Sequence, residues 1–120
     1  MPSRQAVAKE LGVLFKTISH PDRIGIIECL RDEGLNVGEL ARRLELPNSR
    51  VSQHLSALRT LGLVDAESRG REQFYQLRDP KLALWVVEGI DFVANRVGGV
   101  DTDDIVRARE LWGLSTATSQ

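Results

Sequence analysis

Short polar side chains line one side of the stretch from Asn48 to Gly62. On a helix, Val51, Leu55 and Leu58 would form a single apolar stripe, and hydroxyl and amide groups would occupy the opposite face. Side chains of this kind can approach a phosphate backbone closely and still reach the edges of bases. The stretch holds no acidic residue, whereas a solvated surface helix more often pairs Glu with Lys. The spacing therefore favours a nucleic-acid contact, with an ordinary amphipathic helix as the alternative.

The residues of this face have different expected roles. Gln53 can make a paired contact to adenine, and the hydroxyls of Ser49 and Ser52 can contact DNA beside it. Arg50 and Arg59 stand at the margins of the face, which suits them to clamp phosphates rather than to read bases.

The two histidines have structural alternatives. His54 lies toward the packed side of the same helix, where it could donate to a phosphate or, equally, pack against another helix. His20 stands next to Pro21 and lacks companions for a metal site, so we expect it to be structural.

Local rather than global charge must provide any attraction to DNA. The 120 residues carry a net charge of -1, and the pI is near 6.1. Between positions 42 and 78, however, seven arginines stand against four acidic residues. The basic character is regional, as expected for a one-sided nucleic-acid footprint.

The composition is that of a soluble chain with one modest core. Hydrophobic residues make up 42% and charged residues 28% of the sequence, which excludes a disordered chain. No apolar run approaches the roughly 20 residues that a transmembrane helix needs. Lys9 and Glu10 interrupt the apolar residues of the N-terminal stretch, which is therefore not expected to be a secretory signal. Cys29 is the only cysteine, so no internal disulfide can form. We expect a cytoplasmic protein that does not bind membranes.

Two helices are expected at the beginning of the chain. Apolar spacing predicts the first over residues 3–18, and it must end before Pro21. Pro21 is a good first residue for the second helix, which Gly34 should end near residues 31–33. The second helix is expected to be largely buried.

A short third helix completes a motif with the Asn48 stretch. Asn36 followed by Glu39 forms an Asn-headed capping box at its start. A link of about three residues, ending at Pro47, then joins it to the polar helix. These are the dimensions of a helix-turn-helix, whose second helix enters the major groove of DNA.

A β-hairpin is expected after the polar helix. Alternating residues predict strands over 63–68 and 72–77, with Gly70 at the tip. A hairpin this short would not be stable alone, so it should pack beside the helix pair as a wing. Arg69 and Arg71 flank the tip and would project together toward phosphate or the minor groove. The predicted DNA-contacting residues are Asn48, Ser49, Arg50, Ser52, Gln53, His54, Ser56, Arg59, Arg69 and Arg71.

The segment from Lys81 to Val97 predicts a helix that is apolar on nearly every side. In a chain this small, the extra apolar side is most simply covered by a second copy of the chain. The predicted dimer-interface residues are Leu11, Phe15, Leu82, Trp85, Val86, Ile90 and Val93.

The expected fold is mainly α with a small β-hairpin wing, a winged helix-turn-helix in the order α-α-α-α-β-β-α. Gly98 and Gly99 should end the apolar helix, and an extra C-terminal helix should follow, capped by Asp101 or Thr102. We expect residues 1–113 to form a single DNA-binding and dimerisation domain and residues 114–120 to be a disordered tail.

With these elements in order, the chain resembles the ArsR/SmtB family of bacterial winged-helix repressors. The likeness is carried by HPDRIGIIECL (20–30), VGELARRLELPNSRVSQHLSALRTLGLV (37–64) and GREQFYQL (70–77). The resemblance implies a homodimer that binds operator DNA through two recognition helices and leaves when a metal ion or another signal binds.

The resemblance also indicates where the family binds metals or senses oxidation. The Cys-x-Cys of metal-binding members corresponds here to Asn36 and Gly38, so that site is absent. On the last dimer helix only Glu88 and Asp91 offer ligands, and two carboxylates three apart are more often a solvated face. Cys29 has no second cysteine to pair with and most simply acts as a small hydrophobic residue. We therefore expect neither a metal nor a cofactor.

The sequence offers little support for catalysis, since it has no glycine-rich phosphate loop and no nucleophile and base in a motif context. We predict a dimeric repressor of transcription that binds a double-stranded DNA operator and is released by an unidentified signal. A small-molecule effector and a redox effector acting through Cys29 remain alternatives. A winged-helix protein-interaction module that does not bind DNA is the alternative from another class.

Overall fold

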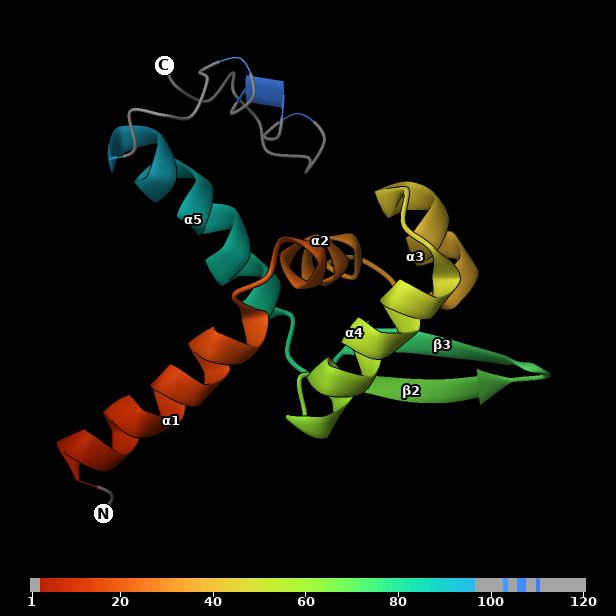
Figure 1. Cartoon of the computed structure of the whole chain (residues 1–120), viewed down its shortest axis with the longest axis horizontal. Helices are drawn as coiled ribbons and strands as arrows, with labels where there is room; N and C mark the ends of the chain where they lie inside the picture. The colour runs from red at the N-terminus through yellow and green to blue at the C-terminus, as the bar shows by residue number, and fades with distance from the viewer. Residues whose placement is uncertain (1–2, 97–102, 104–105, 108–109, 111–120) are drawn as a thin grey trace. The chain divides into compact units, whose positions relative to one another are not determined.

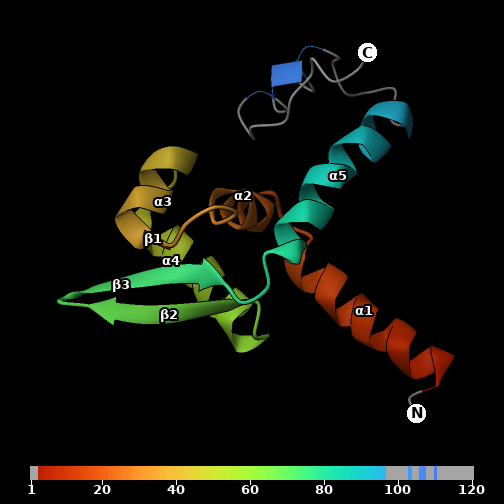
Figure 2. The ribbon, with the colours of Figure 1, turned by 180° about the vertical axis from the view of Figure 1, so that it is seen from behind.

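The computed structural model describes residues 3–96, 103, 106–107 and 110. The chain falls into two compact units, residues 1–80 and 81–120, which are described separately. Figure 1 labels the helices and the strands β2 and β3, and Figure 2 also labels β1. The first unit contains α1 (Arg4–Ile18), α2 (Pro21–Cys29), β1 (Leu35–Asn36), α3 (Val37–Leu44), α4 (Asn48–Thr60), β2 (Val64–Arg69) and β3 (Glu72–Leu77).

The predicted helices of the first unit are confirmed, and their ends follow local capping. The Ser3 side chain accepts a hydrogen bond from the N–H of Ala6 at the start of α1. The capping box of α3 is present in both directions, since Asn36 Oδ1 accepts from the Glu39 N–H and Glu39 Oε1 accepts from the Asn36 N–H. Helix α2 ends at Cys29, a little earlier than the predicted stop near residues 31–33.

The link between α3 and α4 contains one strained residue. Glu45 has a φ of 56°, which places its backbone in the left-handed conformation. This conformation often ends a helix, and residues other than glycine seldom adopt it. The Glu45 N–H bonds to the Ala41 carbonyl and so closes the last turn of α3. Pro47 then precedes α4, so the link is as short as a helix-turn-helix requires.

The sheet has three strands rather than the predicted two. The hairpin of β2 and β3 pairs Val64 with Leu77 and Arg69 with Glu72, and its strands lie close to the predicted ranges 63–68 and 72–77. The additional strand β1 pairs antiparallel with β3, so the strand order is β1-β3-β2 (Figure 2). The prediction missed β1 because two residues are too few to show an alternating pattern.

The core of the first unit is aliphatic and lies between the helices and the sheet. Helix α4 contacts α2, α3 and β2, and its stripe of Val51, Leu55 and Leu58 is fully buried. Ile26 and Ile27 of α2 are also fully buried, but most residues of this helix are only partly buried, so the expectation of a largely buried helix holds on one side alone. The other fully buried large side chains are Leu35, Leu40 and Val64.

Helix α1 differs from the other helices of the first unit because it contains no buried residue. The predicted interface residues Leu11 and Phe15 lie on it, and both are exposed. Among the described residues of the first unit, no element buries the apolar side chains of α1.

The second unit contains α5 (Lys81–Arg96), which confirms the apolar helix predicted over residues 81–97. Trp85 and Val93 on α5 are exposed, whereas Leu82 is buried and Val86 is intermediate. The side chain of Ile90 and the predicted tail at 114–120 lie outside the described residues. Of the helix predicted after Gly99, only residues 103, 106–107 and 110 are described, and they are helical. The described helices include none that is both long and apolar enough to traverse a bilayer.

Candidate nucleic-acid interface

Helix α4 presents the predicted polar face to solvent. Ser49, Ser52, Gln53 and Ser56 are exposed along it, and the fully buried stripe lies on its opposite side. Figure 1 shows α4 following α3 across a short turn, with the hairpin extending beyond the helix pair. The predicted contact residues that the structure leaves exposed are Asn48, Ser49, Arg50, Ser52, Gln53, Ser56, Arg59, Arg69 and Arg71.

His54 is the one predicted contact residue that is not exposed, and it faces α2. Arg23 Nε donates to His54 Nδ1 at 3.1 Å. Because an arginine can only donate, Nδ1 must carry no hydrogen, so the neutral ring holds its hydrogen on Nε2. His54 Nε2 then donates to Asp22 Oδ2 at 3.2 Å. Both ring nitrogens are thus bonded within the protein, as expected for the helix-packing alternative.

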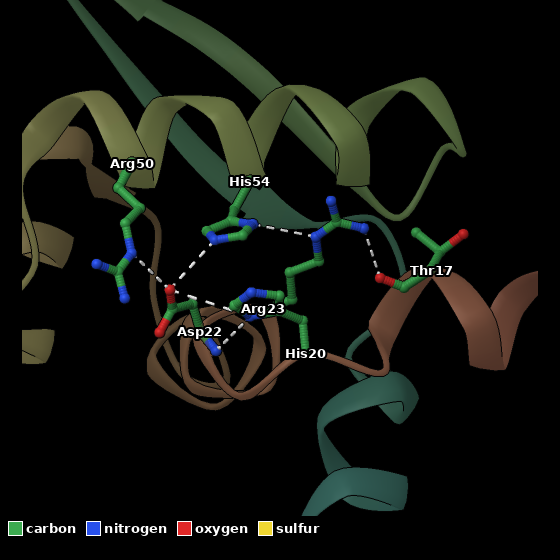
Figure 3. A network of polar contacts seen from close by, with 6 residues as sticks. All are labelled: Thr17, His20, Asp22, Arg23, Arg50 and His54. Atoms are coloured by element: carbon green, nitrogen blue, oxygen red, sulfur yellow. Dashed lines mark hydrogen bonds and ion pairs between the residues drawn. The ribbon is translucent and has the colours of Figure 1, made fainter.

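The same aspartate oxygen binds a second side chain of α4. Arg50 Nε donates to Asp22 Oδ2 at 2.9 Å, so one carboxylate joins α2 to two turns of α4. Figure 3 shows the network, which continues from Arg23 Nη1 to the carbonyl of Thr17 at the end of α1 at 2.7 Å. Three helices therefore meet in one chain of hydrogen bonds.

Ionisation of the network follows from its contacts. The hydrogen bond from the Arg50 guanidinium holds the pKa of the Asp22 carboxyl below its ordinary value, although burial acts in the opposite direction. Burial lowers the pKa of His54, which keeps the ring in the neutral form that the hydrogen-bond pattern requires. Asp22 is a charged anchor at neutral pH, and His54 is its neutral neighbour.

His20, Asp22 and His54 form the one group of metal-ligating side chains among the described residues, with ligand atoms within 4.8 Å of one another. Each of them already has a partner. His20 Nδ1 accepts from the Asp22 N–H at 3.1 Å and so caps α2, and Arg50 and Arg23 bond to Asp22 and His54. Two guanidinium groups already supply the positive charge that a cation would bring, and His54 Nε2 would have to give up its bond to Asp22 to bind one. The group is best described as a packing network.

Of the positions that the resemblance implied for metals, some have other roles, and the side chain of one lies outside the described residues. Asn36 closes the capping box, and its Nδ2 donates to Glu72 Oε2 of β3 at 2.8 Å. Gly38 lies next to it in α3. On α5, Glu88 is exposed and the side chain of Asp91 lies outside the described residues.

The two arginines at the wing tip, Arg69 and Arg71, differ in how firmly their side chains are held. Arg69 donates to Glu67 Oε1 at 3.1 Å, and its guanidinium carbon lies 4.5 Å from the centre of the Phe74 ring. This cation–π contact holds Arg69 along the hairpin. Arg71 follows Gly70, whose φ of 64° makes the tight turn, and its side chain is exposed. Arg71 is therefore better placed than Arg69 to reach beyond the tip.

At the base of the wing, Arg78 Nη2 donates to Asp65 Oδ1 at 2.7 Å. Sequence patterns did not single out this pair, because the two residues stand at the ends of different strands. The contact lowers the pKa of Asp65 and helps to hold the two ends of the hairpin together.

Cys29 is half-buried at the end of α2. Burial raises the pKa of its thiol to about 11, and the neighbouring Glu28 carboxylate adds to the effect. The thiolate is the reactive form of cysteine, so Cys29 is poorly suited to rapid oxidation at neutral pH.

A helix-turn-helix with a β wing and an exposed polar second helix defines the class of winged-helix DNA-binding proteins. Residues 20–66 match the family model described as bacterial regulatory protein, arsR family. The regulator CmtR of Mycobacterium bovis is 40% identical over 93 residues, which cover 78% of this chain and 75% of CmtR. The transcriptional activator HlyU of Vibrio cholerae is 45% identical over 74 residues, which cover 62% of this chain and 68% of HlyU.

Solved structures agree with the sequence matches. The crystal structure of the transcriptional repressor BigR from Xylella fastidiosa superposes with a TM-score of 0.67 at 30% identity, and the match covers 76% of this chain and 96% of BigR. The chain belongs to the ArsR/SmtB family and is a DNA-binding transcription regulator. This family consists of transcription regulators rather than enzymes, and the comparisons do not favour the protein-interaction alternative.

The environment of Cys29 predicts slow thiol chemistry. At about pH 8, on the order of a thousandth of the thiol should be ionised, compared with roughly a quarter for an ordinary cysteine. Alkylation by iodoacetamide, followed by mass spectrometry, should therefore be on the order of 100-fold slower in the folded protein than in the same protein unfolded in guanidinium chloride. Equal rates in the two states would show that Cys29 is a reactive thiol after all.

Proposed function

We propose that this regulator is a dimeric repressor that binds a roughly two-fold symmetric operator in double-stranded DNA through the exposed face of α4. The observation that supports the proposal most is the division of α4 into a fully buried apolar stripe and an exposed face of serine and glutamine. Short polar groups on an outward-facing second helix suit the major groove.

Several side chains of α4 and the wing have roles that follow from their places. Gln53 stands mid-helix, where an amide can pair with adenine, and the serines beside it approach the DNA closely. Arg59 near the end of α4 and Arg71 at the wing tip have the reach and charge to bind phosphates. Arg69 contributes charge from the side of the hairpin. His54 holds the helix in place rather than contacting DNA.

A homodimer would cover the exposed apolar residues of α1 and α5. Leu11 and Phe15 are exposed on α1, and Trp85 and Val93 are exposed on α5. Leu82, Val86 and Ile90 complete the set that we assign to the interface. Two-fold symmetry would place the half-sites about one helical turn of DNA, or a small multiple of it, apart.

Repression, with release by a signal, is the mode we propose. BigR is named a repressor and HlyU an activator, so membership of the family does not fix the sign of regulation. A small-molecule effector is favoured over a redox effector because the raised pKa of Cys29 disfavours its thiolate. Release by a metal at a Cys-x-Cys site is not proposed, since Asn36 and Gly38 occupy those positions.

Base reading and phosphate binding can be separated by two substitutions. Gln53→Ala should reduce affinity for the operator by roughly 10- to 100-fold, with little change for random DNA, because it removes a contact to a base edge. Arg71→Ala should weaken binding to all sequences and lower the slope of log affinity against log salt by about one. The matched control is Gln76→Ala, which replaces an exposed glutamine on β3. Fluorescence anisotropy over a range of salt concentrations measures all three.

Similar losses for Gln53→Ala on operator and random DNA would contradict the division of roles. The operator sequence can be obtained by selecting the duplexes that the wild-type protein binds from a library with a randomised core. A wild-type protein that selects no sequence would contradict sequence-specific binding itself.

The dimer predicts a sharp response to charge on the apolar stripe of α1. Phe15→Asp should raise the dimer dissociation constant by at least about 100-fold, because it removes apolar contact area and buries a charge in the interface. Lys16→Asp, on the next position but outside the stripe, should leave the dimer intact. Light scattering coupled to size-exclusion chromatography gives the mass of each variant. A wild-type monomer, or a Phe15→Asp dimer as stable as the wild type, would contradict the assignment of α1 to the interface.

A further inference from the structure

We propose that Asp22 is a positioning residue for DNA binding: it holds the Arg50 guanidinium so that its terminal nitrogens donate to a base edge of the operator, and not only to the phosphates that the sequence suggested for Arg50. The inference rests on the proposed role of α4 in DNA binding. It adds a specificity-determining residue from α2, a helix outside the helix-turn-helix pair of α3 and α4.

The geometry places the aspartate behind the arginine. The side chain of Asp22 is 14% exposed, whereas that of Arg50 is 52% exposed. Arg50 uses its Nε for the bond to Asp22 Oδ2, at 2.9 Å. Its two terminal nitrogens make no hydrogen bond with the described residues, so they remain available as donors. A DNA group that approaches from solvent would meet the guanidinium before it meets the carboxylate.

Asp22 can orient Arg50 because it is itself held. Oδ2 also accepts from His54 Nε2 at 3.2 Å, and His54 is tied to Arg23 at 3.1 Å. Arg23 in turn donates to the Thr17 carbonyl at 2.7 Å (Figure 3). The side chain of His54 is only 12% exposed, so little water competes for these bonds. Arg50 is therefore fixed from the interior of the protein rather than by a second flexible surface group.

Fixing Arg50 has two effects of opposite sign on DNA binding. A free arginine loses rotamer freedom when it binds DNA, and the bond to Asp22 removes that freedom beforehand. The negative charge of Asp22, however, weakens the attraction of the region for phosphates. Charge alone predicts that a variant without Asp22 binds every duplex more tightly. Positioning predicts that it discriminates less between the operator and other duplexes.

The opposite signs allow a direct test by a double-mutant cycle. The probes are a duplex selected by the wild-type protein from a randomised-core library and a scrambled duplex of the same composition. In the full-length protein, Asp22→Ala should reduce the ratio of affinities for the two duplexes by about tenfold. In an Arg50→Ala background the same substitution should leave the ratio unchanged, because the residue that Asp22 positions is gone.

Two further variants separate positioning from folding and from charge. Asp22→Asn keeps an oxygen that can accept a hydrogen bond from Arg50, so its ratio of affinities should be intermediate. If Asp22→Ala no longer unfolds cooperatively on heating, Asp22→Asn takes its place in the cycle. Asp32→Ala removes a carboxylate that is 76% exposed and bonds to Arg31, and it should leave the ratio unchanged.

The outcomes distinguish this inference from the proposed function. An unchanged ratio in the Asp22 variants, or an equal change in the Arg50→Ala background, would overturn the positioning role while leaving sequence-specific binding intact. A wild-type protein that does not prefer the selected duplex over the scrambled one would instead overturn the proposed function.

Discussion

The burial of one apolar stripe determines which side of α4 faces solvent. Val51, Leu55 and Leu58 are fully buried against neighbouring elements. Exposing each of them would cost roughly 1.5–3 kcal/mol, so rotation of α4 about its own axis is strongly disfavoured. The serines and Gln53 are held outward as a consequence. The capping box fixes the start of α3, and the left-handed Glu45 ends it. Together they set the length of α3 and the short turn that places α4 against the core.

Hydrophobic burial fixes the face of the helix, and the polar network fixes side chains on it. A carboxylate as little exposed as Asp22 requires partners, and Arg50 and His54 provide them from two successive turns of α4. Packing alone would tolerate small shifts of an aliphatic stripe, whereas hydrogen bonds to a single oxygen constrain distance and direction. Side chains on the surface of α4 are thus held in place partly by a residue of another helix, α2.

The sequence predicted most of the fold because most of it depends on local patterns. Helical spacing, the Asn36 capping box and the glycine at the hairpin tip each indicate structure within a few residues. The exposed and buried sides of α4 followed from the same spacing. Strand β1 was missed because its two residues form a strand only through pairing with β3.

The polar network could not be predicted for a related reason. Asp22 and Arg50 are 28 residues apart, and an aspartate near the start of a helix after proline suggests nothing beyond a favourable interaction with the helix dipole. His54 was ambiguous because helical spacing places it between the packed and exposed sides. Its two nitrogen contacts, which only the tertiary structure supplies, favour the packing role.

The most direct test of the central claim, that the polar face of α4 contacts duplex DNA, is a map of the backbone amide resonances that shift when DNA is added. NMR spectra of the labelled full-length protein would be recorded during titration with a duplex that it selects. The largest shifts are expected within residues 48–56 and at the wing tip near Arg71. Saturable binding that leaves the resonances of residues 48–56 unchanged would contradict the claim.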